Sequence, residues 1–361
     1  MLKNKTRLNF GIIDPHIHQW DPYTTPHAAG TLVKLFGKYP KIMQMAVNLV
    51  KSKSLLDTVG DPQYALKPYL PADYKMDLAD YQVDGIIHVE ANWHHHEGFG
   101  VVEETKWIQQ LDFSAQHIQL AGIVAAADPR DPRFKNILLA HQASSPVFKG
   151  IRKMAAWHAD PGVYKWEEKP HLYTNSQFLK GFETLAELDL SFDAWVYSNQ
   201  LYDITVLAKY FPETRIVLDH FATPVGLFGA VGKMTGKTAI QREIIYQHWK
   251  EHITHLSSLK NVYIKFSGLM MPVLGHRYFE RHRQATVEEI VPMLQPLVDH
   301  VIACFGIDRV IYASNFPMDK CNVRMDDLLQ SSIEIIAPLG DAALHKVFLQ
   351  NAIDFYRLDL N

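Results

Sequence analysis

The chain has 361 residues, of which 47% are hydrophobic and 21% charged, and its formal net charge is -3. These values are ordinary for a soluble globular protein, and the length suits either one large barrel or two smaller domains. At this net charge there is no excess of Lys and Arg to bind nucleic acid phosphates. No apolar run approaches the roughly 18 residues of a membrane span. We expect a small-molecule substrate and no nucleic acid or membrane partner.

The cysteines and the first residues bear on the compartment. The two cysteines, Cys304 and Cys321, show neither metal-ligand nor redox spacing. Such sparse cysteine usage favours a reducing compartment. Residues 1–10 contain no apolar stretch of signal-peptide length. We therefore expect a cytoplasmic protein.

Eight short apolar runs recur along the chain. They cover Asn9–Ile13, Gly85–Glu90, Ala121–Ala127, Val147–Ile151, Leu190–Tyr197, Arg215–Leu218, Val262–Phe266 and Val310–Ala313. Continuous rather than alternating apolar runs are typical of strands that are buried on both faces of a parallel sheet. The amphipathic segments between them include Val101–Leu111, Asn175–Leu188, Tyr202–Phe211, Thr238–Leu259 and Thr286–Phe305. The alternation predicts a single-domain (β/α)8 TIM barrel over residues 1–361.

A long segment separates the first two runs. It extends over about residues 22–76, and Val33–Lys53 within it has helical spacing of apolar residues. Loops of this length are usually folded insertions or functional lids. We expect a small helical insertion over the barrel mouth, and an arm that contacts a second copy in a homodimer is an equal alternative. A second excursion, Met154–Thr174, should also lie on the rim.

Polar residues gather at the carboxyl ends of the predicted strands, where TIM barrels carry their chemistry. These residues are His16, His18, Glu90, Asp128, Arg152, His220, Lys265 and Asn315. Turn and cap preferences explain Asp128 and Asp219 as well as function does. They explain two histidines in one strand less well.

The segment Asp14-Pro15-His16-Ile17-His18 is the strongest individual signal. Side chains alternate along a strand, so His16 and His18 face the same way and together can hold a divalent metal ion. His220 adds an imidazole at the end of the sixth strand, unless it is a core histidine bonded to a carbonyl. Glu90 can be a metal ligand, a general base or the partner of a rim cation.

Three cations lie in or beside the predicted strands and are candidates for the barrel interior. Lys149 and Arg152 are three residues apart, so at most one of them points inward on an unbroken strand. Arg152 is the better candidate because a guanidinium grips a carboxylate with two donors, although a salt bridge to Glu90 or Asp128 explains it equally. Lys265 has the same two interpretations. The run His94-His95-His96 is expected to be a solvated loop.

These residues resemble the amidohydrolase-related family of metal-dependent TIM-barrel hydrolases. The matching segments are Asp14–Trp20, His88–Trp93, Phe148–Arg152, Ile216–His220, Lys265–Leu269 and Ala313–Pro317. The family includes lactonases that open sugar lactones and pyrone dicarboxylates and, more distantly, metal-dependent decarboxylases. The resemblance implies a metal site of His16, His18, His220 and Glu90, with zinc expected first and manganese second. Some lactonases of this group need no metal, so a metal-free site also stays open.

The chain departs from this pattern at the eighth strand. Active relatives usually carry Ser-Asp-Trp-Pro or Thr-Asp-Trp-Pro, and this chain has Ser314-Asn315-Phe316-Pro317. An amide cannot act as a general base near neutral pH, although its oxygen can orient a water or bind a metal weakly. Glu90 can take over the role of the missing acid, and Asp319 is a further acid nearby.

Three hypotheses follow. The first is a hydrolase of a small carboxylated or hydroxylated lactone. Glu90 or His220 would activate water, Arg152 and Lys265 would anchor the substrate, and Asn315 would have a supporting role. The second is a non-oxidative decarboxylase of the same superfamily. The third, motivated by Asn315, is a binding protein that has lost its catalytic activity.

Overall fold

The computed structural model describes residues 8–26, 31, 33, 35, 39, 42, 52–60, 64 and 66–360. Eight parallel strands follow one another around the barrel in chain order. They are β1 (Ile12–Ile17), β2 (Val83–Val89), β3 (Gln119–Ala126), β4 (Phe148–Met154), β5 (Ser191–Trp195), β6 (Ile216–Leu218), β7 (Val262–Phe266) and β8 (Val310–Tyr312). The predicted TIM barrel is thereby confirmed.

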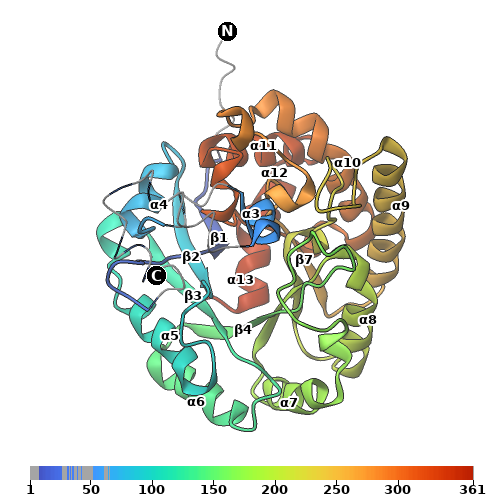
Figure 1. Ribbon diagram of the computed structural model, residues 1–361. Coiled ribbons are helices and arrows are strands. Elements are labelled where there is room, and N and C mark those ends of the chain that lie inside the picture. The colour runs from blue at the N-terminus through green and yellow to red at the C-terminus, as the bar shows by residue number, and fades with distance from the viewer. Residues whose placement is uncertain are drawn as a thin grey trace.

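Helices surround the strands, as Figure 1 shows. After β2 they are α5 (Val102–Gln109), α6 (Phe134–Ser144), α7 (Ser176–Glu187), α8 (Leu201–Tyr210), α9 (Ala239–Leu256), α10 (Val287–Phe305), α11 (Met325–Ile336), α12 (Asp341–His345) and α13 (Asn351–Tyr356). Each of the five predicted helices overlaps one of these. The described helices contain no segment that is both long enough and apolar enough to cross a membrane.

The first strand differs from its prediction. It covers Ile12–Ile17 rather than Asn9–Ile13, so His16 lies inside it. Pro15 lacks a backbone N–H, and the pairing of β1 with β2 shifts register between Asp14 and Ile17. A proline is tolerated inside a strand at such an irregularity.

The barrel closes between β8 and β1 beyond the regular strand ends. The Asn315 N–H donates to the carbonyl of His16 at 2.9 Å, and the His18 N–H donates to the carbonyl of Phe316 at 2.8 Å. Because these bonds join the two motifs directly, Asn315 is held beside the histidines of β1.

The barrel interior is filled by apolar side chains near its base. They are Ile13, Ile87, Val89, Ala121, Val124, Val217 and Ile311, together with Ala352, Phe355, Tyr356 and Leu358 from the end of the chain. Helix α13 therefore packs beneath the strands, and it is visible through the barrel in Figure 1. A packed base leaves the opposite, carboxyl end for polar side chains.

Two short helices of the segment between β1 and β2 are described over their full length. They are α3 (Lys53–Val59) and α4 (Pro71–Asp77), and α3 contacts the turn Pro272–Leu274 after β7. Most of the predicted helix at Val33–Lys53 lies outside the described residues. The single-domain boundaries and the lid or dimer role of residues 22–76 stay predictions.

Candidate active site

His16 is the centre of a buried cluster at the carboxyl end of the barrel. Its ring centroid lies 5.0 Å from that of His18 and 4.6 Å from that of His220. Its Nδ1 is 3.1 Å from Lys265 Nζ, and its Nε2 is 3.3 Å from Arg152 Nη1. Burial and then the charge of Lys265 lower the pKa of His16 well below its ordinary value. A neutral imidazole has one lone pair, so it can accept a hydrogen bond from only one of these two cations.

Lys265 lies deeper than His16. Its side chain is 0% exposed, and its ammonium lies 2.5 Å from Asp193 Oδ2 and 3.3 Å from Asp219 Oδ1. The hydroxyl of Tyr356 donates to the same Asp193 carboxylate at 2.9 Å. Burial raises the pKa of Asp193, and the Lys265 charge opposes that rise. Lys265 therefore neutralises the buried carboxylates beside His16, and its role as a substrate anchor stays a prediction.

Asp219 and His220 follow β6 in a tight turn. The φ angles of His220, Phe221, Ala222 and Thr223 are 55°, 51°, 59° and 41°. This left-handed run turns the backbone sharply, and such conformations are maintained only when the surrounding structure fixes them. The Nδ1 of His220 lies 2.9 Å from Ser267 Oγ. At Gly268 any Cβ would come within 2.4 Å of the His220 ring, so the glycine makes room for it.

The state of His18 follows from its hydrogen bond. Its Nδ1 lies 2.8 Å from the carbonyl of Val89 and must donate to it. Burial and then Arg152 lower the pKa of His18 to about 3. The imidazole is therefore neutral, and Nε2 carries its lone pair.

Glu90 and Arg152 form a buried ion pair. The distances from Glu90 Oε1 to Arg152 Nε and Nη2 are 2.8 and 2.7 Å, and Nη2 also donates to the Glu90 carbonyl. Of the alternatives for Arg152, the salt bridge to Glu90 is the one that forms. Lys149 instead donates to the carbonyl of Arg357. Nη1, which faces His16, is the part of Arg152 not bound to Glu90.

A second buried pair supports this side of the barrel. The Nε2 of His88 lies 3.3 Å from Oε1 of Glu104 on α5, which also accepts the Ala91 N–H at 2.7 Å. The Nδ1 of His88 accepts the Gln19 N–H at 3.3 Å. Burial raises the pKa of Glu104 to about 7 and lowers that of His88 to about 3. This pair ties the end of β1 to the residues after β2.

Asn315 follows β8 with φ at 58°. Its Nδ2 donates to Asp319 Oδ1 at 3.2 Å, and Asp319 Oδ2 accepts the Met270 N–H at 3.3 Å. Both side chains are buried, and burial raises the pKa of Asp319 to about 7. Asp319 therefore does reach Asn315.

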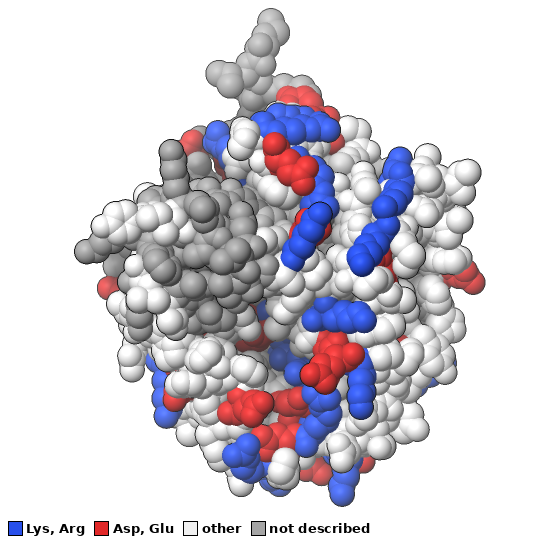
Figure 2. Space-filling view, in the orientation of Figure 1, with Lys and Arg blue, Asp and Glu red and all other residues white. Residues whose placement is uncertain are grey.

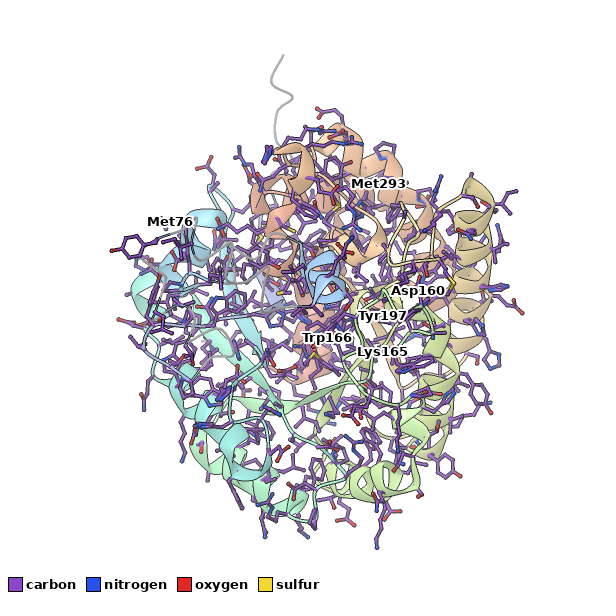
Figure 3. The ribbon with its side chains drawn as sticks, viewed as in Figure 1. Met76, Asp160, Lys165, Trp166, Tyr197 and Met293 are labelled. Carbon is purple, nitrogen blue, oxygen red and sulfur yellow. The ribbon has the colours of Figure 1, made fainter. Side chains whose placement is uncertain are left out.

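Aromatic rings line the cluster on the β4 and β5 side. The Trp195 ring lies 6.0 Å from His220 and 5.8 Å from the Arg152 guanidinium carbon, and Trp166 packs 5.1 Å from Trp195. Trp166 comes from the excursion after β4, and Figure 3 places it beside Lys165 and Tyr197 near the barrel axis. These rings give the cluster an apolar wall.

The outer surface of this end carries charges of both signs, which lie interspersed around a central hollow in Figure 2. One such group on the rim joins Arg130 and Lys153 to Asp128 and Glu167. His94, His95 and His96 are exposed, as predicted. A cavity of about 600 Å³ lies to one side of the mouth, lined by Tyr69, Phe279, Pro317 and Lys320 among others. It does not include the buried histidines.

One group of three side chains among the described residues has the geometry for a metal ion. The nitrogen or oxygen atoms of His16, Asp219 and His220 lie within 4.8 Å of one another. In the described part of the chain, both carboxylate oxygens of Asp219 lack a hydrogen-bond partner. The Lys265 ammonium lies 3.3 Å from Asp219 Oδ1 and forms an ion pair with it. Neutral imidazoles and an unbonded carboxylate are donors that zinc and manganese accept. The donor set therefore fits such an ion.

The predicted site residues do come together, but in two groups. His16 and His220 share a group with Asp219, whereas Glu90 is bound to Arg152 and His18 lies beside His16. The predicted metal set of His16, His18, His220 and Glu90 stays a prediction. Sequence reasoning assigned Asp219 to a turn and did not consider Asp193 or Glu104 for the site. Asp219 directly precedes His220, and that adjacency was the available signal.

The amidohydrolase family pattern matches residues 13–358. The chain belongs to the amidohydrolase family. It is 28% identical over 353 residues to the uncharacterized protein y4mH of Sinorhizobium fredii, covering 97% of this chain and 99% of that protein. It is also 27% identical over 267 residues to the L-fucono-1,5-lactonase of Burkholderia ambifaria, covering 71% of this chain and 77% of the lactonase.

Solved structures share the fold at low identity. An amidohydrolase from Burkholderia multivorans with bound zinc has a TM-score of 0.67 at 18% identity, over 97% of this chain and 100% of that one. A dihydroxybenzoic acid decarboxylase from Polaromonas with bound manganese has a TM-score of 0.53 at 13% identity, over 96% of this chain and 97% of that one. These likenesses establish the barrel architecture.

Proposed function

We propose that this amidohydrolase hydrolyses a small lactone or a related cyclic ester that bears carboxylate or hydroxyl groups. The observation that carries the proposal is the group His16, Asp219 and His220, which places neutral imidazoles and an unbonded carboxylate together at the carboxyl end of the barrel. The likeness of the chain to the L-fucono-1,5-lactonase of Burkholderia ambifaria supports the proposed substrate class. Hydrolysis of such an ester needs a proton acceptor for water and donors for the carbonyl oxygen.

His220 is the side chain best suited to take the proton from the attacking water. Its pKa is lowered by burial and by His16, so it is neutral and has a lone pair available. Ser267 fixes the ring at Nδ1, which leaves Nε2 for the water. Glu90 is less suited because Arg152 already occupies Oε1 and the Asn92 N–H binds Oε2 at 3.2 Å.

In the proposed step, water oxygen bonds to the ester carbonyl carbon as His220 takes a water proton. The ring C–O bond then breaks, and the proton on His220 passes to the leaving alkoxide, which gives a hydroxy acid. Arg152 Nη1 is a cationic donor 3.3 Å from His16 Nε2 and would bind the carbonyl oxygen or a substrate carboxylate. Trp195 and Trp166 would shield the reacting atoms from bulk water.

A divalent ion would be held by His16, Asp219 and His220. When bound, zinc or manganese supplies Lewis-acid polarisation of the carbonyl and lowers the pKa of water. His220 is then a ligand rather than a base, and either role places it at the centre of the reaction. Lys265 and Arg152 lie on either side of His16 and oppose the charge of the ion.

Elemental mass spectrometry on tag-free protein tests the metal assignment, with the double variant His16→Ala/His18→Ala as the partner. Near-stoichiometric zinc or manganese in the wild type, lost in the double variant, supports the metal-dependent form. A lactone panel with acid release as the readout tests the reaction. If Glu90→Gln and His220→Asn both leave turnover of a confirmed substrate unchanged, the proposed roles are wrong.

A decarboxylase is the second candidate, and the barrel shared with the manganese-containing Polaromonas decarboxylase favours it. It would break a carbon–carbon bond and release carbon dioxide from an aromatic-type acid. Measuring acid release and gas evolution on the same compounds separates the two reactions, because a lactonase gives acid alone.

A further inference from the structure

The side-chain amide of Asn315 is hydrogen-bonded through its nitrogen, whereas its oxygen has no hydrogen-bond partner in the described part of the chain. Nδ2 donates to Asp319 Oδ1 at 3.2 Å. Oδ1 is buried and has no hydrogen-bond partner in the described part of the chain. An unpaired buried acceptor is costly, so its orientation needs a cause.

Asp319 supplies that cause. Above its raised pKa of about 7, Asp319 is a carboxylate that can only accept hydrogen bonds, so at pH 8 the NH2 end of the amide must face it. The reversed amide would place Asn315 Oδ1 against Asp319 Oδ1 and lose a charge-assisted bond. The second Asp319 oxygen is held by the Met270 N–H at 3.3 Å, and this bond keeps the carboxylate in place.

The amide oxygen of Asn315 lies beside His18. The backbone bonds from Asn315 N–H to the His16 carbonyl and from His18 N–H to the Phe316 carbonyl hold the two residues side by side. Because His18 donates from Nδ1 to Val89, its Nε2 is also an acceptor. The amide oxygen has no hydrogen-bond partner in the described part of the chain, and the imidazole nitrogen of the neighbouring His18 is a second acceptor. A cation or the hydrogen of a water or substrate suits such a position.

We propose that Asp319 is a positioning residue that orients the Asn315 amide, so that the pair presents a neutral carbonyl oxygen beside His18. The acidic residue that the family resemblance leads one to expect at position 315 is thus found four residues later, behind an amide. The orientation holds whatever the chain catalyses, and its use in turnover rests on the proposed hydrolase function.

The two positions should tolerate an exchange of acid and amide better than two acids. Asn315→Asp alone sets two buried carboxylates against each other, which disfavours the ionised pair. Adding Asp319→Asn restores a donor. The amide that this second substitution places at position 319 can donate to the carboxylate at position 315, and its own oxygen can still accept the Met270 N–H.

Thermal unfolding at pH 8 of the wild type, both single variants and the double variant tests this. We expect Asn315→Asp to lower Tm by about 5 °C or more, and Asn315→Asp/Asp319→Asn to recover most of that loss. Should Asn315→Asp fail to accumulate as folded protein, recovery of folded protein in the double variant is the same result. A double variant no better than Asn315→Asp would overturn the proposal.

Asn351 offers a matched control. It is also a buried asparagine, but its Nδ2 donates to the carbonyls of Ile307 and Val310 rather than to a carboxylate. Adding Asp319→Asn to Asn351→Asp should not restore the Tm that Asn351→Asp loses. Equal recovery in both backgrounds would mean that Asp319→Asn stabilises the barrel generally, and it would count against the proposal.

Zinc affinity, measured by competition with a chromophoric chelator, tests what the amide oxygen of Asn315 does. The exchanged pair presents a carboxylate beside His18 in place of an amide oxygen, so it should bind zinc about tenfold more tightly than the wild type. Unchanged affinity would show that this oxygen does not face the ion. If the wild type binds no zinc, the metal-dependent form of the proposed function fails, and the unfolding comparison still decides the orientation.

Discussion

Buried charged groups have different partners on the two sides of the barrel mouth. On the β2 and β4 side, Glu90 is paired with Arg152 and Glu104 with His88. On the β1 and β6 side, the Asp219 carboxylate forms an ion pair with Lys265 at 3.3 Å but no hydrogen bond with any described residue, and His16 can accept a hydrogen bond from only one of the two cations beside it. Groups whose hydrogen bonds are complete stabilise a structure and are poorly available for chemistry, whereas acceptors with a free lone pair can bind an ion or a proton. The first side is therefore a support, and the second is where a reaction is expected.

The sharpest test of the supporting side is Arg152→Met. It leaves Glu90 buried without its cation, and the free energy of unfolding should fall by about 3–5 kcal/mol. Urea unfolding monitored by tryptophan fluorescence measures the loss. Lys149→Met, on the same strand but bonded to a carbonyl of Arg357, should cost no more than about 0.5 kcal/mol. Equal losses would mean that the Glu90–Arg152 pair has no special structural role.

On the reactive side, His220→Asn should lower turnover strongly and stability little. We expect turnover of a confirmed lactone to fall by about 100-fold or more, because the proton acceptor is removed. The fold should persist, as judged by circular dichroism and Tm. His94→Asn, in the exposed loop after β2, is the control and should leave turnover unchanged. A His220→Asn protein that is fully active would reverse the assignment of the two sides.

The Glu104–His88 pair gives a pH test. Glu104 has a raised pKa of about 7, so it holds its proton longer in the folded state, and its contribution to stability falls as pH rises from about 4.5 to 7. The pKa of His88 is lowered to about 3, and its contribution rises between about pH 3 and 6.5. Between about pH 4.5 and 6.5, the stability contributions of Glu104 and His88 change in opposite directions with pH.

Glu104→Gln removes one of these slopes. Relative to the wild type, the variant should gain up to about 3 kcal/mol of unfolding free energy between pH 4.5 and 7. Urea midpoints across this range measure the difference. A constant difference between the two proteins would show that Glu104 titrates near its ordinary pKa in the folded state.

The smallest expected effect is that of Ser267→Ala, which removes the hydroxyl that fixes His220. We expect a loss of about 1 kcal/mol in unfolding free energy and roughly tenfold in turnover. Ser258→Ala, which removes a hydroxyl bonded to the carbonyl of His255 at an exposed position, is the matched control. An unchanged turnover in Ser267→Ala would mean that other contacts orient the imidazole.

The sequence predicted the barrel well because buried parallel strands are continuous apolar runs. The first strand was misplaced since a register irregularity accommodates Pro15. The strand-end rule located His16, His220 and Arg152, but period-two alternation gives the face of a side chain and not its depth. Lys265 is paired with Asp193, a residue that no motif indicated.

Contacts between residues that are distant in sequence could not be predicted either. Glu104 lies on α5 and meets His88 through the packing of the helix on the strands, and nothing in the spacing of the two residues indicates that contact. The orientation of the Asn315 amide depends on Asp319 and Met270, so it could be assigned only once the turn after β8 was known.

The hydroxyl that Tyr356 donates to Asp193 has a consequence for biosynthesis. Tyr356 follows all eight strands, and its helix packs beneath the barrel. All eight strands and Tyr356 must therefore leave the ribosome before Asp193, the partner of Lys265, has its full set of hydrogen bonds. Until then the apolar side chains that this helix covers stay exposed, and at this stage of synthesis a chaperone would help most.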